Sequence, residues 1–392
     1  MLTITPADRI ASIKPYFFAS LNQKLLSLKE KGVDIIRIDM GSPDLPPAKF
    51  IIDVLIDDVL KNDKHGYTPN GGTSSYRYAV AEYYAKRFDV ELDPYKEVLG
   101  LIGSKEGLFH LGQVILNPGD ISLIPDPGYP VYQAASEIAG AEIYPVPLVQ
   151  ENNYLPDLDA IPKDIIQRAK LLWINYPNNP TGAVAPFTFY EKVVDFAKTN
   201  DILIAHDAPY TDICFDNYVA PSILQVKGAS EVAIEFNSLS KTYNMAGWRL
   251  GMAVGNQQVI GYLNTYKSQM DSSHFLPILD AGVKALTSEQ NWLIERNLIY
   301  KTRRDIVVKA LRAAGLEVEI PTAAIYVWAK LPKGEDSLKF CDQLLEETGV
   351  STTPGIVYGK YGEGYLRVSL GTSTERLIEA MDRFSRWVII KS

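Results

Sequence analysis

The feature that most constrains the fold is an alternation of short apolar runs with amphipathic runs of helical period, between about residues 49 and 285. Apolar runs of strand length occupy residues 121–125, 171–175, 202–206, 232–236 and 250–255. Helical runs lie between them, including residues 104–116, 189–198 and 259–269. Strands that alternate with helices form βαβ units, which build a mostly parallel sheet between helices. The sequence therefore predicts an α/β fold.

The pattern changes after about residue 291. A long helical run leads into two strand-like runs, and a helix, a strand and a closing helix follow, at residues 292–314, 316–320, 324–329, 337–347, 365–370 and 373–388. This order is typical of a smaller α+β domain. Because 392 residues exceed the size of one ordinary core, we expect two domains. We predict a large domain over residues 46–290 and a small C-terminal domain over 291–392, with residues 1–45 forming an arm and part of the small domain.

Composition and charge exclude several classes of function. The net charge is −8 and no dense Lys/Arg run is present, which argues against a nucleic-acid partner. No stretch of about 18 apolar, uncharged residues indicates a membrane span. The N-terminus lacks the basic and apolar regions of a secretory signal. Cys214 and Cys341 form no CxxC motif, so we expect a reduced, cytoplasmic protein without disulfides, and we expect no metal site.

The segment over residues 238–251, Ser-Leu-Ser-Lys-Thr-Tyr-Asn-Met-Ala-Gly-Trp-Arg-Leu-Gly, follows an apolar strand-like run. It combines Lys241 with the hydroxyls of Ser238 and Ser240 and with Arg249. A lysine can form a Schiff base with a carbonyl cofactor. Hydroxyls and a guanidinium group suit a phosphate dianion. Taken alone, the segment could equally be a polar loop whose Lys241 and Arg249 are solvated.

Polar residues follow two of the apolar runs. Asp207 ends the run at 202–206, and a carboxylate buried there needs a cation such as a protonated pyridine nitrogen. The alternative is a helix N-cap. Asn179 lies in the Asn-Pro-Gly-rich turn after residues 171–175. It could direct its amide to a ring oxygen, or the turn could be a surface loop.

Three other segments carry weaker signals. Ser104 and Lys105 follow Gly103 at the start of a helical run, where free backbone N–H groups attract anions. Tyr129 follows a strand-like run and could stack on a flat heterocycle. Arg367 lies inside an apolar run and could bind a carboxylate. The ordinary alternatives are a plain helix start, a core tyrosine and an arginine that points outward from a strand.

In this order and spacing, the six segments resemble the class I/II aminotransferases of the fold-type-I pyridoxal-phosphate family. The likeness covers nearly the whole chain, and the stretch around Lys241 is its most specific part. The resemblance implies a pyridoxal 5'-phosphate (PLP) enzyme that moves an amino group between an L-amino acid and a 2-oxo acid by a ping-pong mechanism. It also implies a homodimer with shared active sites.

The resemblance also implies the roles of individual residues. Lys241 would form the Schiff base and shuttle the proton, while Asp207 would pair with the pyridine nitrogen. Asn179 and Tyr210 would bind the phenolic oxygen of the ring, and Tyr129 would stack on the ring.

The phosphate and the substrate would each have their own residues. The phosphate would be held by Ser104, Lys105, Ser238, Ser240, Arg249 and, from the neighbouring subunit, Tyr67. Arg367 would bind the substrate α-carboxylate beside Asn179. Gly41 would line the substrate pocket with its backbone, since the lack of a side chain allows close approach.

The sequence constrains the identity of the substrate less than it constrains the family and the cofactor. Several stretches, at residues 9–10, 14–18, 102–107, 126–132 and 175–184, look most like bacterial LL-diaminopimelate aminotransferases. The Ala208-Pro209 pair departs from that pattern, and an aspartate- or alanine-type aminotransferase is the alternative. Lys105 is our candidate for a distal carboxylate of the substrate.

Other classes of protein remain as alternatives. A PLP-dependent C–S lyase is possible on the same fold. A transcriptional regulator would need an additional DNA-binding domain. A nicotinamide enzyme is set aside, because no GxGxxG follows a strand-like run.

Overall fold

The computed structural model describes residues 4–11, 13 and 17–391. Residues 14–16, part of a stretch quoted above, lie outside the described residues. The larger sheet has seven strands in the order β2-β8-β7-β6-β5-β3-β4. Their bounds are β2 (Val98–Leu101), β3 (Ile121–Asp126), β4 (Glu142–Pro147), β5 (Ala169–Asn175), β6 (Leu203–Asp207), β7 (Ala233–Ser238) and β8 (Gly251–Gly255). The strands β4, β3, β5, β6 and β7 pair in parallel, and β8 is antiparallel to both of its neighbours. The predicted α/β class with a mostly parallel sheet is confirmed.

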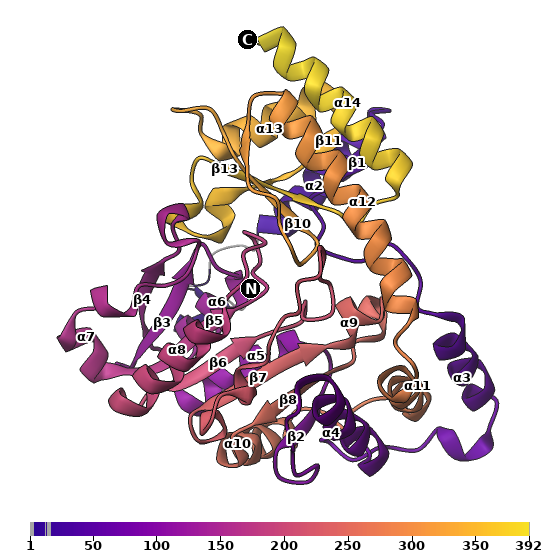
Figure 1. The fold of residues 1–392 in the computed structure, drawn as a ribbon, viewed down its shortest axis with the longest axis vertical. Helices are drawn as coiled ribbons and strands as arrows, with labels where there is room; N and C mark the ends of the chain where they lie inside the picture. The colour runs from indigo at the N-terminus through magenta and orange to yellow at the C-terminus, as the bar shows by residue number, and fades with distance from the viewer. Residues whose placement is uncertain (1–3, 12, 14–16, 392) are drawn as a thin grey trace.

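Helices cover both faces of this sheet (Figure 1). The helices of this unit are α3 (Lys49–Val59), α4 (Ser74–Phe88), α5 (Ser104–Ile115), α6 (Pro130–Ile138), α7 (Lys163–Arg168), α8 (Phe187–Asn200), α10 (Gln257–Lys267) and α11 (Leu276–Thr287), of which α3 packs on α11. Adjacent residues of β5 pack on opposite sides: Ile174 belongs to the core that contains Val193 of α8, and Trp173 to the core that contains Leu108 of α5. Because both faces are buried, the central strands read as continuous apolar runs.

The two edge strands, β2 and β4, did not appear among the predicted strands. Strand β2 has only four residues and includes Gly100. Strand β4 contains Pro145 and Pro147 and is mostly exposed or half-buried. Proline and glycine weaken the strand signal, and proline is tolerated at sheet edges because the edge lacks one hydrogen-bonded neighbour. The apolar pattern that predicts a strand is therefore absent from the two edge strands, which pair with one neighbouring strand instead of two.

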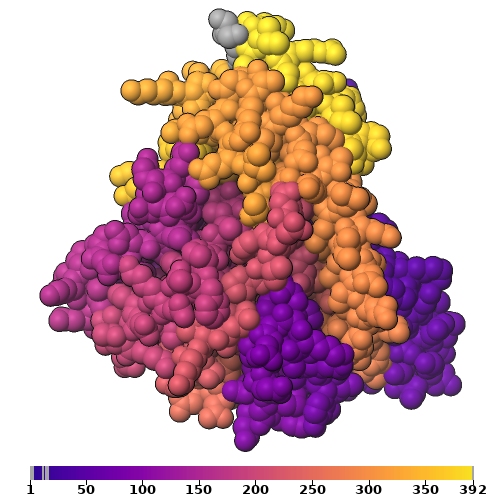
Figure 2. All heavy atoms as spheres, viewed as in Figure 1, coloured from indigo at the N-terminus to yellow at the C-terminus, as the bar shows by residue number. Residues whose placement is uncertain are grey.

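The C-terminal part contains a second sheet, with the order β12-β13-β10-β9. These strands are β9 (Glu317–Val318), β10 (Tyr326–Lys330), β12 (Thr353–Pro354) and β13 (Tyr365–Ser369), and the helices beside them are α12 (Trp292–Ala313), α13 (Ser337–Thr348) and α14 (Thr374–Lys391). Phe340, Leu366 and Phe384 share its core. The orange and yellow C-terminal segment caps the upper part of the molecule in the space-filling view (Figure 2). The predicted smaller α+β unit is confirmed, while its boundary at residue 291 stays a prediction.

The N-terminal segment packs against this second unit with its later part, while its first helix contacts α6 of the larger unit. It contains α1 (Asp8–Ala11), α2 (Phe17–Glu30) and β1 (Ile36–Arg37). Strand β1 pairs in parallel with β11 (Val350–Ser351), and the Ser369 N–H donates to the Ile38 carbonyl at 2.7 Å. This pairing places residues 39–42 beside β13, which carries Arg367. No helix of the described residues is long and apolar enough to cross a membrane.

Candidate active site

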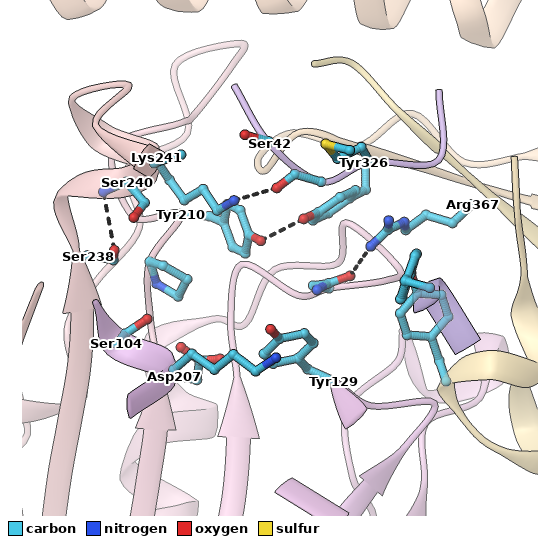
Figure 3. Close-up of a pocket in the computed structure, with 18 of the residues that line it drawn as sticks. Ser42, Ser104, Tyr129, Asp207, Tyr210, Ser238, Ser240, Lys241, Tyr326 and Arg367 are labelled. Carbon is cyan, nitrogen blue, oxygen red and sulfur yellow. Dashed lines mark hydrogen bonds between the residues drawn. The ribbon is translucent and has the colours of Figure 1, made fainter. Parts of the chain in front are cut away.

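One pocket of about 370 Å³ brings together all but one of the predicted site residues. It lies where β5, β6 and β7 end, which is where open α/β sheets bind ligands. Figure 3 shows the labelled side chains converging on it. The predicted residues that line it are Gly41, Ser104, Lys105, Tyr129, Asn179, Asp207, Tyr210, Ser238, Ser240, Lys241, Arg249 and Arg367.

Lys241 lies on a one-turn helix, α9 (Leu239–Thr242), and not in the polar loop that was the alternative. Ser238 caps this helix, because its Oγ accepts a hydrogen bond from the Ser240 N–H at 3.2 Å. The Lys241 Nζ donates to the Gly41 carbonyl. Burial lowers the pKa of Lys241 to about 8, and the positive charges of Arg367 and Arg249 act in the same direction. At pH 7 about a tenth of such an amine is neutral, far more than for an ordinary lysine, and a nucleophilic or basic amine requires the neutral form.

Asp207 is the last residue of β6 and is 4% exposed. Its Oδ2 accepts a hydrogen bond from the Tyr132 hydroxyl at 2.6 Å, while its Oδ1 has no partner among the residues that the structure describes. Burial raises the pKa of Asp207 to about 6, although the Tyr132 hydrogen bond opposes that rise. No helix of the described residues starts directly after Asp207, since the next one begins at Ile223, so the N-cap alternative is wrong. A buried carboxylate oxygen that faces a pocket is a site for a cationic donor.

Arg367 points into the pocket and is 3% exposed, so the alternative of an outward-pointing arginine is wrong. Its Nη1 donates to the Asn179 Oδ1 at 2.8 Å, and its Nη2 donates to the Asp39 carbonyl at 2.6 Å. The guanidinium carbon lies 4.3 Å from the centre of the Tyr326 ring. Since these acceptors are neutral, the guanidinium can also bind a carboxylate.

Tyr210 and Gly41 both meet Tyr326, which the sequence did not indicate. The hydroxyls of Tyr210 and Tyr326 are 2.7 Å apart. A Cβ added at Gly41 would lie 2.3 Å from the Tyr326 Oη, so only glycine fits there without a shift. The backbone at Gly41 therefore forms the wall of the pocket beside Lys241.

Groups that can bind an anion gather at the end of the pocket away from Tyr326. Ser104 begins α5 directly after Gly103, whose φ is 75°. The Arg249 guanidinium packs so closely on Gly103 that an added Cβ would lie 2.4 Å from its Nη2. The buried Ser240 Oγ has no partner among the described residues. Burial and the charge of Arg249 lower the pKa of Lys105. Cations, a hydroxyl and a helix N-terminus around one space favour a phosphate-like group.

Tyr67 is the predicted residue that does not line the pocket. Its side chain is 96% exposed. The pocket also includes residues that the sequence analysis did not assign, namely Phe18, Asn22, Arg37, Met40, Ser42, Pro209, Ala246, Tyr326 and Tyr358. Tyr132 was missed as the partner of Asp207, although it follows Tyr129 by one helical turn. That spacing was the one signal that could have indicated it.

Comparison with known proteins decides the family. The model for aminotransferase class I and II matches residues 33–384. The chain belongs to the class I and II aminotransferases. It is 48% identical to the LL-diaminopimelate aminotransferase of Moorella thermoacetica over 380 residues, which cover 97% of each protein. The resemblance drawn from the six segments is thereby confirmed.

Solved structures support the same assignment. A substrate-bound structure of BacF from Bacillus subtilis matches with a TM-score of 0.95 and 37% identity, over 98% of each chain. An aspartate aminotransferase variant from Thermus thermophilus matches with a TM-score of 0.91 and 29% identity, over 98% of this chain and 100% of that one. This aminotransferase therefore shares its whole architecture, and not only its motifs, with these solved structures.

Proposed function

We propose that this aminotransferase uses PLP and acts on LL-diaminopimelate. The observation that carries the cofactor assignment is the pairing, across one pocket, of the Lys241 amine with the unpartnered Oδ1 of Asp207. An aldehyde that condenses with Lys241 and carries a basic ring nitrogen toward Asp207 would satisfy both groups. The anion-binding end, at Ser104, Ser240 and Arg249, suits the phosphate of the same molecule.

The position of each side chain in the pocket indicates its role in the reaction. When bound, PLP supplies an electron sink for the charge that develops at the substrate Cα. Asp207, ionised and shielded from water, would keep the ring nitrogen protonated. Arg367 and Asn179 would hold the α-carboxylate and so orient the Cα–H bond toward Lys241. Once the substrate amine has displaced it from the cofactor aldehyde, the Lys241 amine would take the Cα proton and deliver it to the former aldehyde carbon, which its lowered pKa favours.

Two observations support LL-diaminopimelate as the amino donor. The first is the identity of 45–48% to eight proteins with that printed activity, over 96% or more of this chain. The second is Lys105, whose Nζ lies 5.9 Å from the centre of the Tyr129 ring in the wall of the pocket. A cation there could reach the distal carboxylate of a long substrate. We therefore propose that Lys105 binds the distal carboxylate of the substrate and also lies near the phosphate.

Half-reaction spectroscopy tests the function directly. Protein loaded with PLP is mixed with single amino acids, namely LL-diaminopimelate, glutamate, aspartate, alanine and an aromatic amino acid. We expect the fastest loss of the absorption band of the bound cofactor with LL-diaminopimelate. Faster loss with aspartate or alanine would reassign the substrate, and release of pyruvate and ammonia would indicate a lyase. Borohydride labelling should mark Lys241, and a label elsewhere would contradict the cofactor assignment.

We also propose that the protein is a homodimer in which Tyr67 reaches the phosphate of the partner. Its side chain is almost fully exposed, as expected of a tyrosine that acts across an interface. Sedimentation or light scattering would measure the oligomeric state, and a monomer that retains activity would contradict this proposal.

A further inference from the structure

A buried ion cluster lies behind the phosphate end of the pocket. Its centre is Lys267, the last residue of α10, which is 0% exposed. The Lys267 Nζ donates to the Glu106 Oε1 at 2.7 Å and to both carboxylate oxygens of Asp271 at 2.8 Å. A lysine is seldom buried completely, and the hydrogen bonds to two carboxylates offset the cost of removing its charge from water. None of these residues lines the pocket.

One branch of the cluster fixes the loop before α5. Glu106 lies in the first turn of that helix, and its second oxygen, Oε2, accepts the backbone N–H of Ile102. This hydrogen bond closes the turn around Gly103, whose left-handed backbone leads directly to Ser104. The orientation of the first N–H groups of α5 therefore depends on the position of the Glu106 carboxylate, which Lys267 holds.

The other branch fixes Arg249. The Asp271 Oδ1 accepts the Ser273 N–H at 2.9 Å, and the next residue, His274, donates from its Nε2 to the Arg249 carbonyl at 2.7 Å. Arg249 has φ of 59°, a conformation that an L-residue adopts only when its surroundings impose it. The nitrogen that faces the carbonyl must carry the proton, since a carbonyl only accepts.

The same branch also reaches the segment that carries Tyr67. The neighbouring residue, Thr68, donates from its Oγ1 to the His274 carbonyl at 2.7 Å. The cluster thus connects the loop before Ser104, the backbone of Arg249 and the base of the Tyr67 segment. In the proposed function, the first two belong to the phosphate site of this chain, and Tyr67 belongs to the phosphate site of the partner.

We propose that Lys267 and His274 are positioning residues for the phosphate site, which hold its anion-binding groups in place without contacting the ligand. The inference rests on the proposed function, because it takes the bound anion to be the phosphate of PLP. It predicts that disrupting the cluster weakens recognition of the phosphate and leaves recognition of the aldehyde and the ring unchanged.

The test compares two ligands that differ only in the phosphate. Cofactor-free protein is titrated with PLP and with pyridoxal, and binding is followed by absorption. For Lys267→Met, the Kd for PLP should rise by about tenfold or more, as expected when charge-assisted hydrogen bonds are misplaced. The Kd for pyridoxal should change by less than about twofold. A parallel rise for both ligands, or no rise for either, would overturn the inference.

A second pair of variants separates position from charge. Lys267→Met also removes a positive charge, whereas burial lowers the pKa of His274 and so favours a neutral ring. His274→Leu should therefore weaken PLP binding by about tenfold without changing the net charge near neutral pH. His274→Gln keeps a donor that can reach the Arg249 carbonyl and should restore most of the affinity. Equal loss of PLP affinity in both His274 variants would contradict the role of that hydrogen bond. If Lys267→Met does not fold, the two His274 variants alone test the proposal.

A matched control is available in the C-terminal part of the chain. Arg304 is 3% exposed and donates to Asp216 and, at 3.0 Å, to the Pro321 carbonyl. Arg304→Met also removes a buried cation, so it should lower the melting temperature while leaving the ratio of the PLP and pyridoxal affinities unchanged. If Arg304→Met lowered the affinity for PLP relative to pyridoxal as much as Lys267→Met does, a specific role of the cluster would be contradicted. If wild-type protein bound no PLP at Lys241, the proposed function itself would fail.

Discussion

Replacing Tyr132 by phenylalanine removes the one hydrogen bond that the described residues make to the Asp207 carboxylate. Tyr132 is 0% exposed, and its hydroxyl donates to the Asp207 Oδ2 at 2.6 Å. Its ring also stacks on Trp173, with 5.0 Å between the ring centres. Phenylalanine keeps that ring and removes only the donor, so the change acts on the carboxylate rather than on the packing.

The expected magnitude follows from the burial of the pair. A hydrogen bond to a charged group contributes about 1.5–3 kcal/mol, and each pH unit of pKa corresponds to about 1.4 kcal/mol. Burial already raises the pKa of Asp207 to about 6. Loss of the Tyr132 donor removes an interaction that favours the ionised form. The pKa of Asp207 should therefore rise further, by about 1 to 2 pH units.

The stability of the cofactor-free protein should report this rise. The pKa of Asp207 is higher in the folded than in the unfolded protein, so the folded state binds the proton more tightly. Its contribution to the free energy of unfolding is therefore largest at low pH and falls as pH rises toward about 6. In Tyr132→Phe the fall continues to higher pH. The destabilisation by the substitution should grow by about 1.5–3 kcal/mol between pH 5 and pH 8.5.

Urea denaturation of the two proteins across this pH range measures the difference. Tyr176→Phe provides the control, because the Tyr176 hydroxyl is also buried but donates, at 2.6 Å, to the Tyr154 carbonyl. A carbonyl does not titrate, so the destabilisation by the control should not depend on pH. A pH-independent effect of Tyr132→Phe as well would refute the proposed electrostatic link between Tyr132 and Asp207.

Three further predictions concern the same pocket. Lys105→Ala should raise the KM for dicarboxylic substrates by roughly tenfold and the KM for alanine less, because only the former carry a second carboxylate; equal effects would contradict this role. Arg367→Lys should lower kcat/KM by about a hundredfold, since an ammonium cannot form the paired hydrogen bonds of a guanidinium to a carboxylate; unchanged steady-state kinetics would exclude the α-carboxylate assignment. Co-expression of Tyr67→Ala and Lys241→Ala chains should restore activity in about a quarter of all sites. Half of the randomly paired dimers contain one chain of each kind, and one of the two sites in such a dimer is intact. Activity no higher than that of either variant alone would contradict a role of Tyr67 in the partner's site.

The sequence was most informative about residues at the ends of buried strands. Asp207, Asn179 and Lys241 each follow an apolar run that became a central strand of the larger sheet. The carboxyl ends of neighbouring parallel strands meet at one edge, so a local pattern was enough to place these residues together. The pattern was less informative about β2 and β4, where glycine and proline interrupt the edge strands.

The sequence could not indicate groups whose importance comes from a distant partner. Tyr326 meets Tyr210 across 116 positions, and Lys267 meets Glu106 across 161. No local spacing relates the members of such a pair, and this chain has 23 tyrosines. The same holds for Tyr132, which is an ordinary helical tyrosine until the fold brings the Asp207 carboxylate to its hydroxyl.

By itself, then, the sequence determined the chemical groups of this aminotransferase and the class of sheet that presents them, because strand and helix periodicities are local. The tertiary structure alone decided the electrostatic state of those groups. Burial of Lys241 and Asp207 in one pocket moves the pKa of the amine down and the pKa of the carboxyl up. The physical reason is that desolvation depends on every chain segment that closes around a group, and those segments come together only when the whole chain has folded.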